Sequence, residues 1–221
     1  MNTVRLHSKP LLGAFLIVVV LGATYVSTLL PGPGYSGDAA KFQFLGYVLG
    51  TPHETGYPTY VLLNHLFTGF FPFGTLAYKA NLLSAFCSVS ASLLLFAILR
   101  RMAVDPLISF ITTTAFGFGY TVWSQSIVAE VYSLNLLFVS LVAYYFTRWH
   151  LERNNWLFYA GCTTYAISFG NHLTMITLLP AIVYLVWVTD RATFSDMKKV
   201  AGVFFIIILG CVQYSYIFWR T

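Results

Sequence analysis

The first long apolar stretch of the chain, LLGAFLIVVVLGATYVSTLL, occupies residues 11–30 and contains no charged side chain. An α-helix of about 20 apolar residues is long enough to cross the hydrocarbon core of a bilayer. A cleavable signal peptide has a shorter apolar centre followed by small residues at the cleavage site. Residues 23–27 imitate such a site, but the length of the run favours an uncleaved first helix that spans the membrane.

The composition extends this conclusion to the rest of the chain. Of the 221 residues, 58% are hydrophobic and 9% are charged, and the mean hydropathy is +0.74. A soluble domain carries about a quarter charged residues, and a domain of this size leaves much of its surface in contact with its solvent. We therefore predict an all-α integral membrane protein with the bilayer as the solvent around its helices.

Six further apolar runs follow the first, and together the seven predict about seven transmembrane helices. The six runs occupy residues 78–99, 106–122, 126–147, 156–170, 173–189 and 200–218. The longest stretch between runs, residues 31–77, is expected to be an extracytoplasmic loop that carries short interfacial helices. Residues 1–221 are expected to form one membrane domain that is incomplete at its C-terminal end.

The basic residues predict the orientation of this domain. With the N-terminus in the cytoplasm, nine of the twelve Lys and Arg residues fall in cytoplasmic segments, which is the usual bias of membrane proteins. The three on the outer face are Lys41, Lys79 and Arg220. A rival topology with residues 59–73 as a span would place eight of the twelve outside, so we expect that segment to lie in the outer interface. Because the cations are scattered, we expect no nucleic-acid partner.

Three carboxylates fall at or near the outer face. Asp38 and Glu54 belong to the loop, and Glu130 is expected about one turn inside the outer end of the fourth span. Ionisable residues at membrane depth are functional candidates by default. Asp38 has a structural alternative as the N-cap of a short helix, and the two roles are compatible because a helix N-terminus keeps a carboxylate ionised.

Other polar residues near the outer face also have structural alternatives. His53 beside Glu54 is a weak indication of a metal site, and further ligands would have to come from elsewhere. Tyr132, like Glu130, does not belong in lipid and must face protein or water. The alternative for Glu130 is a buried carboxyl satisfied by a neighbouring Tyr or His. The pair Asn171-His172 has a helix-capping alternative.

Five short motifs occur in the order in which a known family has them. They are Gly37-Asp38, His53-x-x-Gly56-Tyr57-Pro58-x-Tyr60, Asn81-Leu82-Leu83-Ser84, Ala129-Glu130-Val131-Tyr132-Ser133-Leu134 and Asn171-His172-Leu173-Thr174. The chain resembles the GT-C membrane glycosyltransferases, specifically the protein O-mannosyltransferase-like branch catalogued as a domain of unknown function. The resemblance covers residues 30–185.

The resemblance implies transfer of a sugar from a polyprenyl-phosphate-linked donor to an acceptor hydroxyl on a protein or glycan. The reaction would take place on the extracytoplasmic face of a bacterial inner membrane or of the endoplasmic reticulum. Asp38 matches the acidic residue taken as the general base of the family, which must lie within hydrogen-bond reach of the acceptor. The residues that we expect in substrate binding are Lys41, His53, Glu54, Tyr57, Tyr60, Glu130, Tyr132, Asn171 and His172.

Lys41 departs from the family pattern, which has an acidic residue three positions after the loop aspartate. On a helix, Lys41 and Asp38 share a face and can pair; the alternative is that Lys41 meets the donor phosphate. Because this second carboxylate is missing, the resemblance gives less support for a bound divalent cation. A transporter or flippase of lipid-linked sugars, a catalytically inactive relative and a structural subunit remain alternatives, although no charged residue lies near the centre of a predicted span, where transporters bind substrate.

Overall fold

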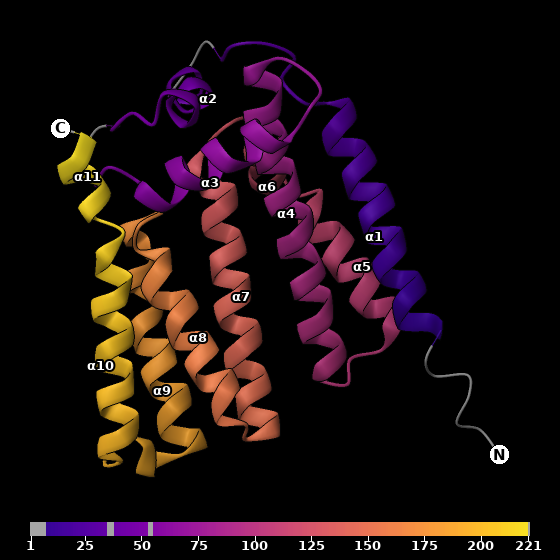
Figure 1. The fold of residues 1–221 in the computed structure, drawn as a ribbon. Helices are drawn as coiled ribbons and strands as arrows, with labels where there is room; N and C mark the ends of the chain where they lie inside the picture. Colours follow the sequence, from indigo (N-terminus) through magenta and orange to yellow (C-terminus); the bar gives the residue numbers. More distant parts are fainter. Residues whose placement is uncertain (1–7, 35–37, 53–54, 221) are drawn as a thin grey trace.

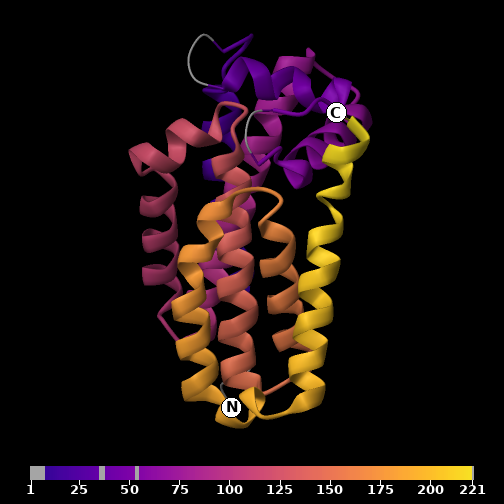
Figure 2. The ribbon, with the colours of Figure 1, turned by 90° about the vertical axis from the view of Figure 1, so that its left-hand side faces the viewer.

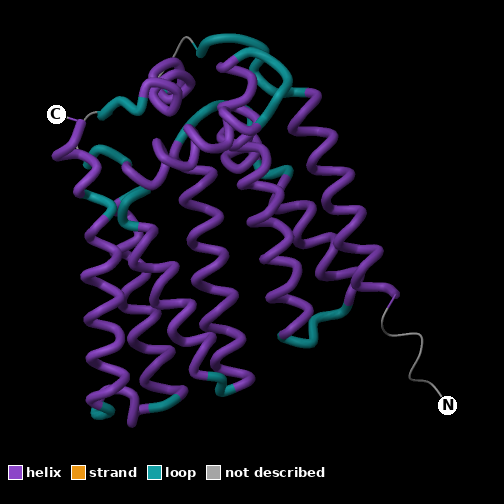
Figure 3. Tube along the Cα trace, in the orientation of Figure 1, coloured by secondary structure: helices purple, strands orange, loops and turns teal. Residues whose placement is uncertain are grey.

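The computed structural model describes residues 8–34, 38–52 and 55–220 of the chain. In this part of the chain the regular elements are helices, without a strand (Figure 3). The longer helices are α1 (Ser8–Ser27), α4 (Leu76–Arg101), α5 (Pro106–Gly117), α7 (Val131–Glu152), α8 (Asn155–Ser168), α9 (Leu179–Thr189) and α10 (Met197–Val212). The shorter ones are α2 (Ala39–Val48), α3 (Pro58–Phe70), α6 (Tyr120–Ser126), η1 (Leu173–Leu178), η2 (Arg191–Phe194) and α11 (Ser215–Arg220).

The longer helices form a bundle, and α2 and α3 cover one of its ends (Figure 1). In the bundle α4 packs against α1 and α5 on one side and against α7 on the other, and α7, α8 and α10 continue the packing. Figure 2 shows α10 and α11 running along one edge up to the covered end. There the Arg220 guanidinium donates to the carbonyl oxygens of Leu49 and Val48, each at 2.8 Å. The predicted all-helical class is confirmed.

Helix length limits how many elements qualify as membrane spans. By length and composition, α4 and the continuous stretch Met197–Arg220 could each cross a bilayer, and α6 with α7 adds a third if this pair, bent by 118°, is one broken span. The stretches Leu11–Ser27, Pro106–Gly117 and Leu173–Thr189 are apolar but shorter. The described residues thus contain two or three candidate spans where the sequence predicted about seven.

The third apolar run shows why the helices are shorter than the runs. The run continues to residue 122, but α5 ends at Gly117, where the chain turns into α6. A Cβ at Gly117 would lie 2.5 Å from a methyl carbon of Leu21 on α1, so the two helices pack closely at this glycine. The Tyr25 hydroxyl donates to the Gly117 carbonyl at 2.7 Å. Tertiary contacts therefore end the helix inside an apolar run.

Two apolar cores hold the bundle together. The larger lies between α2, α3, α4, α7, α8 and α9 and includes Phe42, Tyr60 and Trp149. The smaller joins α1 to α4 and α5 through Ile17 and Leu21. Large apolar side chains also remain exposed along the outer faces of α1 and α10. An apolar surface of this extent is typical of a protein that meets lipid, and it indicates a membrane protein.

The position of Glu130 differs from the sequence prediction. The fourth apolar run was taken to begin at residue 126, which would place Glu130 inside a span. Instead α7 begins at Val131, and Glu130 has an extended backbone (φ −144°, ψ 153°) in the short break after α6. The backbone N–H of Ala129, in the same break, donates to a side chain of α4. Glu130 therefore lies in the break before α7 and not inside a helix.

Candidate functional site

Helix starts come together at the end of the bundle that α2 and α3 cover. The residue before each start is one of the predicted site residues: Asp38 for α2, Tyr57 for α3, Glu130 for α7 and His172 for η1. The first turn of an α-helix has N–H groups without a helical partner and carries the positive end of the helix dipole. The starts of α2, α3 and α7 therefore favour negative charge at this end of the bundle.

Asp38 occupies the N-cap position of α2 but does not use its side chain as a cap. No hydrogen bond joins its carboxylate to the first-turn amides, in contrast to the structural alternative derived from the sequence. Its Oδ1 lies 2.7 Å from the Lys41 Nζ, and each of the two side chains is 36% exposed. Of the two roles predicted for Lys41, the structure thus shows the ion pair along one helix face.

Glu130 faces this ion pair from the start of α7. The backbone amides of Asp38 and Val131 favour the ionised form of its carboxylate, and the neighbouring Tyr or His partner expected from the sequence stays a prediction. Burial raises the pKa of Glu130 above its ordinary value, and repulsion from Asp38 raises it further, while the two amides and Lys41 act in the opposite direction. Two carboxylates and one lysine therefore interact at this point.

Aromatic rings line the site beside the charged group. The ring of His172 lies between two tyrosine rings, with its centroid 6.0 Å from that of Tyr57 and 5.7 Å from that of Tyr132. Tyr57 adopts a left-handed backbone conformation (φ 41°, ψ 49°), which is rare for a residue with a side chain. The Nδ1 of His172 accepts a hydrogen bond from the Thr174 N–H at 3.2 Å, so the predicted capping role is present. Burial lowers the pKa of His172, which favours the neutral imidazole.

Two of the predicted substrate-binding residues lie behind this surface. Tyr60 is 1% exposed and packs edge-on against Phe42, with ring centroids 5.1 Å apart. Its buried hydroxyl has no hydrogen-bond partner in the described part of the chain. Burial raises its pKa, and the charge of Glu130 adds a smaller effect. Asn171 is fully buried and donates from Nδ2 to the Val131 carbonyl at 3.1 Å, which fixes the start of α7.

Asn81 belongs to a motif quoted above but was not predicted as a site residue. It is fully buried on α4, where its Oδ1 accepts from Gln43 Nε2 at 3.0 Å and from the Ala129 N–H at 2.8 Å. Its Nδ2 donates to the Leu30 carbonyl at 2.8 Å. One amide thus joins the segment after α1, the helix that follows Asp38 and the residue before Glu130. The sequence feature that could have identified Asn81 is its position as a polar residue inside an apolar run.

Two site predictions cannot be placed. His53 and Glu54 lie outside the described residues, so their part in the site stays a prediction. Among the residues that the structure does describe, no group of three or more His, Cys, Asp and Glu side chains is arranged to hold a metal ion. The divalent cation implied by the resemblance likewise stays an expectation.

Comparison with known proteins assigns the family. Residues 38–195 match the family model described as Protein O-mannosyl-transferase TMEM260 N-terminal domain. The chain belongs to this family. The matched segment of this TMEM260 N-terminal domain begins at Asp38 and contains the site residues described above.

Two curated relatives carry the same family name. The Protein O-mannosyl-transferase TMEM260 of Mus musculus is 35% identical over 139 residues, which is 62% of this chain and 19% of the relative. The Protein O-mannosyl-transferase tmem260 of Dictyostelium discoideum is 23% identical over 222 aligned positions, which cover 93% of this chain and 27% of the relative. The chain therefore spans only about a fifth to a quarter of the length of these relatives. No solved structure matches the chain.

Proposed function

We propose that this chain is a membrane glycosyltransferase domain of GT-C type that takes a sugar from a polyprenyl-phosphate-linked donor and passes it to an acceptor hydroxyl on a protein or glycan. The observation that carries the proposal is the meeting of Asp38, Lys41 and Glu130 where helix starts converge. The family supports it, because the relatives of the chain are named O-mannosyl-transferases.

In the proposed topology each of the seven longer helices crosses the membrane, with the N-terminus in the cytoplasm. Local thinning of the bilayer accommodates the shorter helices, and the basic residues fit this orientation. The site then lies at the extracytoplasmic face. The α3 helix lies in the outer interface, where the exposed rings of Phe70 and Phe73 enter the lipid.

In the proposed reaction Asp38 takes the proton of the acceptor hydroxyl as its oxygen bonds to the anomeric carbon of the sugar. The bond between that carbon and the donor phosphate breaks, and polyprenyl phosphate leaves with the electron pair. The Lys41 ammonium and the starts of α2 and α7 stabilise the negative charge of the leaving group. A carboxylate paired with a lysine at 2.7 Å is a weak base. In this proposal acceptor binding therefore separates Lys41 from Asp38 before the proton is transferred.

The other site residues position the substrates in this proposal. The neutral His172 ring and the flanking Tyr57 and Tyr132 present aromatic faces to the sugar and polar groups to its hydroxyls. Glu130, which interacts electrostatically with Asp38 and Lys41, forms a wall of the site. Tyr60 and Asn171 act from behind this surface by holding the starts of α3 and α7 in place.

The test is the substitution Asp38→Asn, introduced into the gene itself so that the rest of the protein is unchanged. We expect sugar transfer from the lipid-linked donor, measured in isolated membranes with equal protein levels, to fall by about 10²–10⁴-fold because a general base is lost. The matched control is Asp105→Asn at the opposite end, where Asp105 caps α5 through the Leu107 amide. Unchanged transfer in Asp38→Asn would show that Asp38 is not the base.

The Asp38–Lys41 ion pair also fits a second candidate function. A carboxylate already neutralised by a lysine is what a catalytically inactive relative, or a flippase of lipid-linked sugars, would retain. Flux of a labelled lipid-linked sugar across vesicles that contain the protein separates the two candidates. Flux without any transfer that depends on Asp38 would favour the flippase over the transferase.

A further inference from the structure

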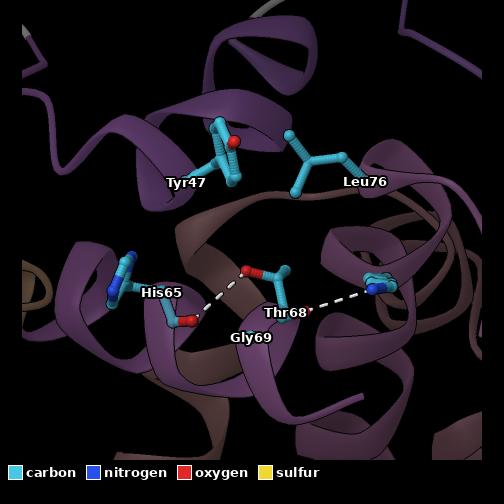
Figure 4. Close-up of a pocket in the computed structure, with 6 residues that line it drawn as sticks. Tyr47, His65, Thr68, Gly69 and Leu76 are labelled. Atoms are coloured by element: carbon cyan, nitrogen blue, oxygen red, sulfur yellow. Dashed lines mark hydrogen bonds between the residues drawn. The ribbon is translucent and has the colours of Figure 1, made fainter. Parts of the chain in front are cut away.

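A second cavity lies toward the C-terminal end of α3, between α2, α3 and α4 (Figure 4). Its volume is about 370 Å³, and it is lined by Tyr47, His65, Thr68, Gly69, Leu76 and Lys79. In Figure 4, Tyr47 and Leu76 stand on one side of the cavity and His65 and Thr68 on the other. None of these residues belongs to the candidate site around Asp38. The volume is within the range of ligand pockets, which is about 300–1,000 Å³.

The cation of this cavity is Lys79. Its Nζ donates to the Thr68 carbonyl at 3.3 Å. That carbonyl needs a donor from outside the helix, because the residue four positions later is Pro72, which has no N–H. This contact uses one of the three hydrogens of the ammonium. No carboxylate lines the cavity, and no ion pair joins Lys79 to another described residue.

The other outer-face cations are differently engaged. Lys41 pairs with a carboxylate at 2.7 Å, and Arg220 makes two hydrogen bonds of 2.8 Å to carbonyls at the end of α2. The polar lining of the cavity also includes His65, whose Nδ1 lies 2.8 Å from the Gly46 carbonyl. Because a carbonyl only accepts, Nδ1 carries the proton in this contact, and Nε2 is left for another partner. The cavity is therefore electropositive and can make hydrogen bonds.

The rim of the cavity is apolar and exposed. The ring of Tyr47 is 67% exposed, and next to the cavity lining the rings of Phe70, the last residue of α3, and Phe73 are 84% and 72% exposed. Exposed aromatic rings of this kind are typical of the membrane interface. A ligand of this cavity would therefore combine an anionic head with an apolar body. We propose that the cavity binds the phosphate group of a membrane phospholipid, with Lys79 as the principal contact.

The proposal is tested by lipid binding, measured by native mass spectrometry on the intact detergent-purified protein. The probes are phosphatidylglycerol and a diacylglycerol with the same acyl chains. We expect the phospholipid to be retained and the diacylglycerol to be lost. Lys79→Gln should weaken phospholipid binding by about tenfold, because a charge-assisted hydrogen bond is removed, and Lys79→Arg should restore most of it.

Gly69→Leu separates lipid binding from any effect on folding. A Cβ built at Gly69 has no heavy atom within 4 Å, so a larger side chain can enter the cavity while Lys79 is kept. Leucine also favours the helix over glycine. We expect Gly69→Leu to weaken phospholipid binding about as much as Lys79→Gln, with no loss of thermal stability. Arg220→Gln is the control for a general charge effect and should leave binding unchanged.

Three results would overturn the proposal. One is equal retention of diacylglycerol and phosphatidylglycerol. Another is unchanged binding in both Lys79→Gln and Gly69→Leu, which would leave Lys79 only the role of capping α3. The third is displacement of the lipid by inorganic phosphate at equal concentration, which would assign the cavity to a soluble anion. Because the measurement does not involve sugar transfer, its failure is distinguishable from failure of the proposed function.

Discussion

At the end of the bundle that α2 and α3 cover, two carboxylates interact with one lysine, whereas at the opposite end Glu152 and Asp190 face matched basic partners. Asp38 and Glu130 repel each other, and Lys41 pairs with the former. At the other end Glu152 contacts two arginines, at 2.7 Å and 2.8 Å, and Asp190 lies 2.9 Å from Lys199. Crowded carboxylates are costly for folding, so their retention points to a function at the covered end.

The two ends also differ in how deeply their polar groups are buried. At the covered end the contacts of Asn81 join three segments of the chain inside the core. At the opposite end the ion pairs lie on the surface, where solvent and salt weaken them. The comparison predicts that substitutions at the covered end have large effects and that those at the opposite end have small ones.

The largest effect is expected from Asn81→Ala. The substitution leaves the Leu30 carbonyl, the Ala129 N–H and the Gln43 amide without their partner in the core. We expect a loss of about 3 kcal/mol in the free energy of unfolding, measured by denaturant titration in detergent. The control is Ser92→Ala on the same helix. Ser92 is also buried, but it bonds only to the carbonyl of Ser88, and its loss should cost less than about 1 kcal/mol. Equal losses in Asn81→Ala and Ser92→Ala would show that the three contacts of Asn81 contribute no more to stability than the single contact of Ser92.

Asn81 also illustrates what the sequence could and could not predict. The apolar runs predicted the helices, and the spacing of Asp38 and Lys41 predicted that they can pair. The break before Glu130 was missed because Ile127 and Val128 continue the apolar run, while the contacts that bend the chain come from distant residues. One of these is the hydrogen bond from the Leu30 N–H to the Ile127 carbonyl, at 3.0 Å.

The lengths of the helices differ from the lengths of the apolar runs for a related reason. Run length measures hydrophobicity and not helix length, and tertiary contacts such as that of Gly117 with Leu21 decide where a helix ends. Within the site, the motifs identified the residues but not their depth. Tyr60 and Asn171 lie in the core, while Tyr57 and His172 line the site, although all four belong to equally polar motifs.

The second prediction concerns Glu130→Gln and its dependence on pH. An acid whose pKa is raised by folding stabilises the folded state while it is protonated, and this contribution is lost as the pH rises through the raised pKa. Glutamine keeps the shape without the charge. Above the ordinary pKa of 4.5 we therefore expect the variant to gain stability over the parent, reaching about 2 °C in melting temperature at neutral pH. Thermal unfolding followed by tryptophan fluorescence between pH 4 and pH 8 measures it. A difference in melting temperature that does not change with pH would mean that ionisation of Glu130 does not destabilise the folded state.

Tyr60→Phe is expected to have a smaller effect on stability, and it tests whether every buried polar group at the covered end stabilises the fold. The Tyr60 hydroxyl is buried without a hydrogen-bond partner among the described residues, so its removal leaves no new unpaired group. We expect the variant to be more stable by about 0.5 kcal/mol. The matched control is Tyr25→Phe, which removes a hydroxyl that donates at 2.7 Å and should cost about 1 kcal/mol. If Tyr60→Phe is instead the more destabilising of the two, the hydroxyl has a partner that the fold does not explain.

The smallest effect is expected from Asp190→Asn at the opposite end. The hydrogen bond from Lys199 holds the pKa of Asp190 below its ordinary value, with help from Thr193. A lowered acid pKa stabilises the folded state above the ordinary value of 3.8, and this contribution is lost as the pH falls through the lowered pKa. Because the pair is only partly buried and solvent screens it, we expect a loss of only about 0.3 kcal/mol at pH 7. Asparagine keeps the oxygen that caps η2 through the Ala192 amide, so the substitution removes the charge and the second acceptor oxygen but not the cap. The measurement is the difference in unfolding free energy between parent and variant at pH 7 and at pH 3, with and without 1 M salt. A loss at pH 7 as large as that of Asn81→Ala would remove the contrast between the two ends, since a partly buried ion pair would then stabilise the fold as much as a fully buried network.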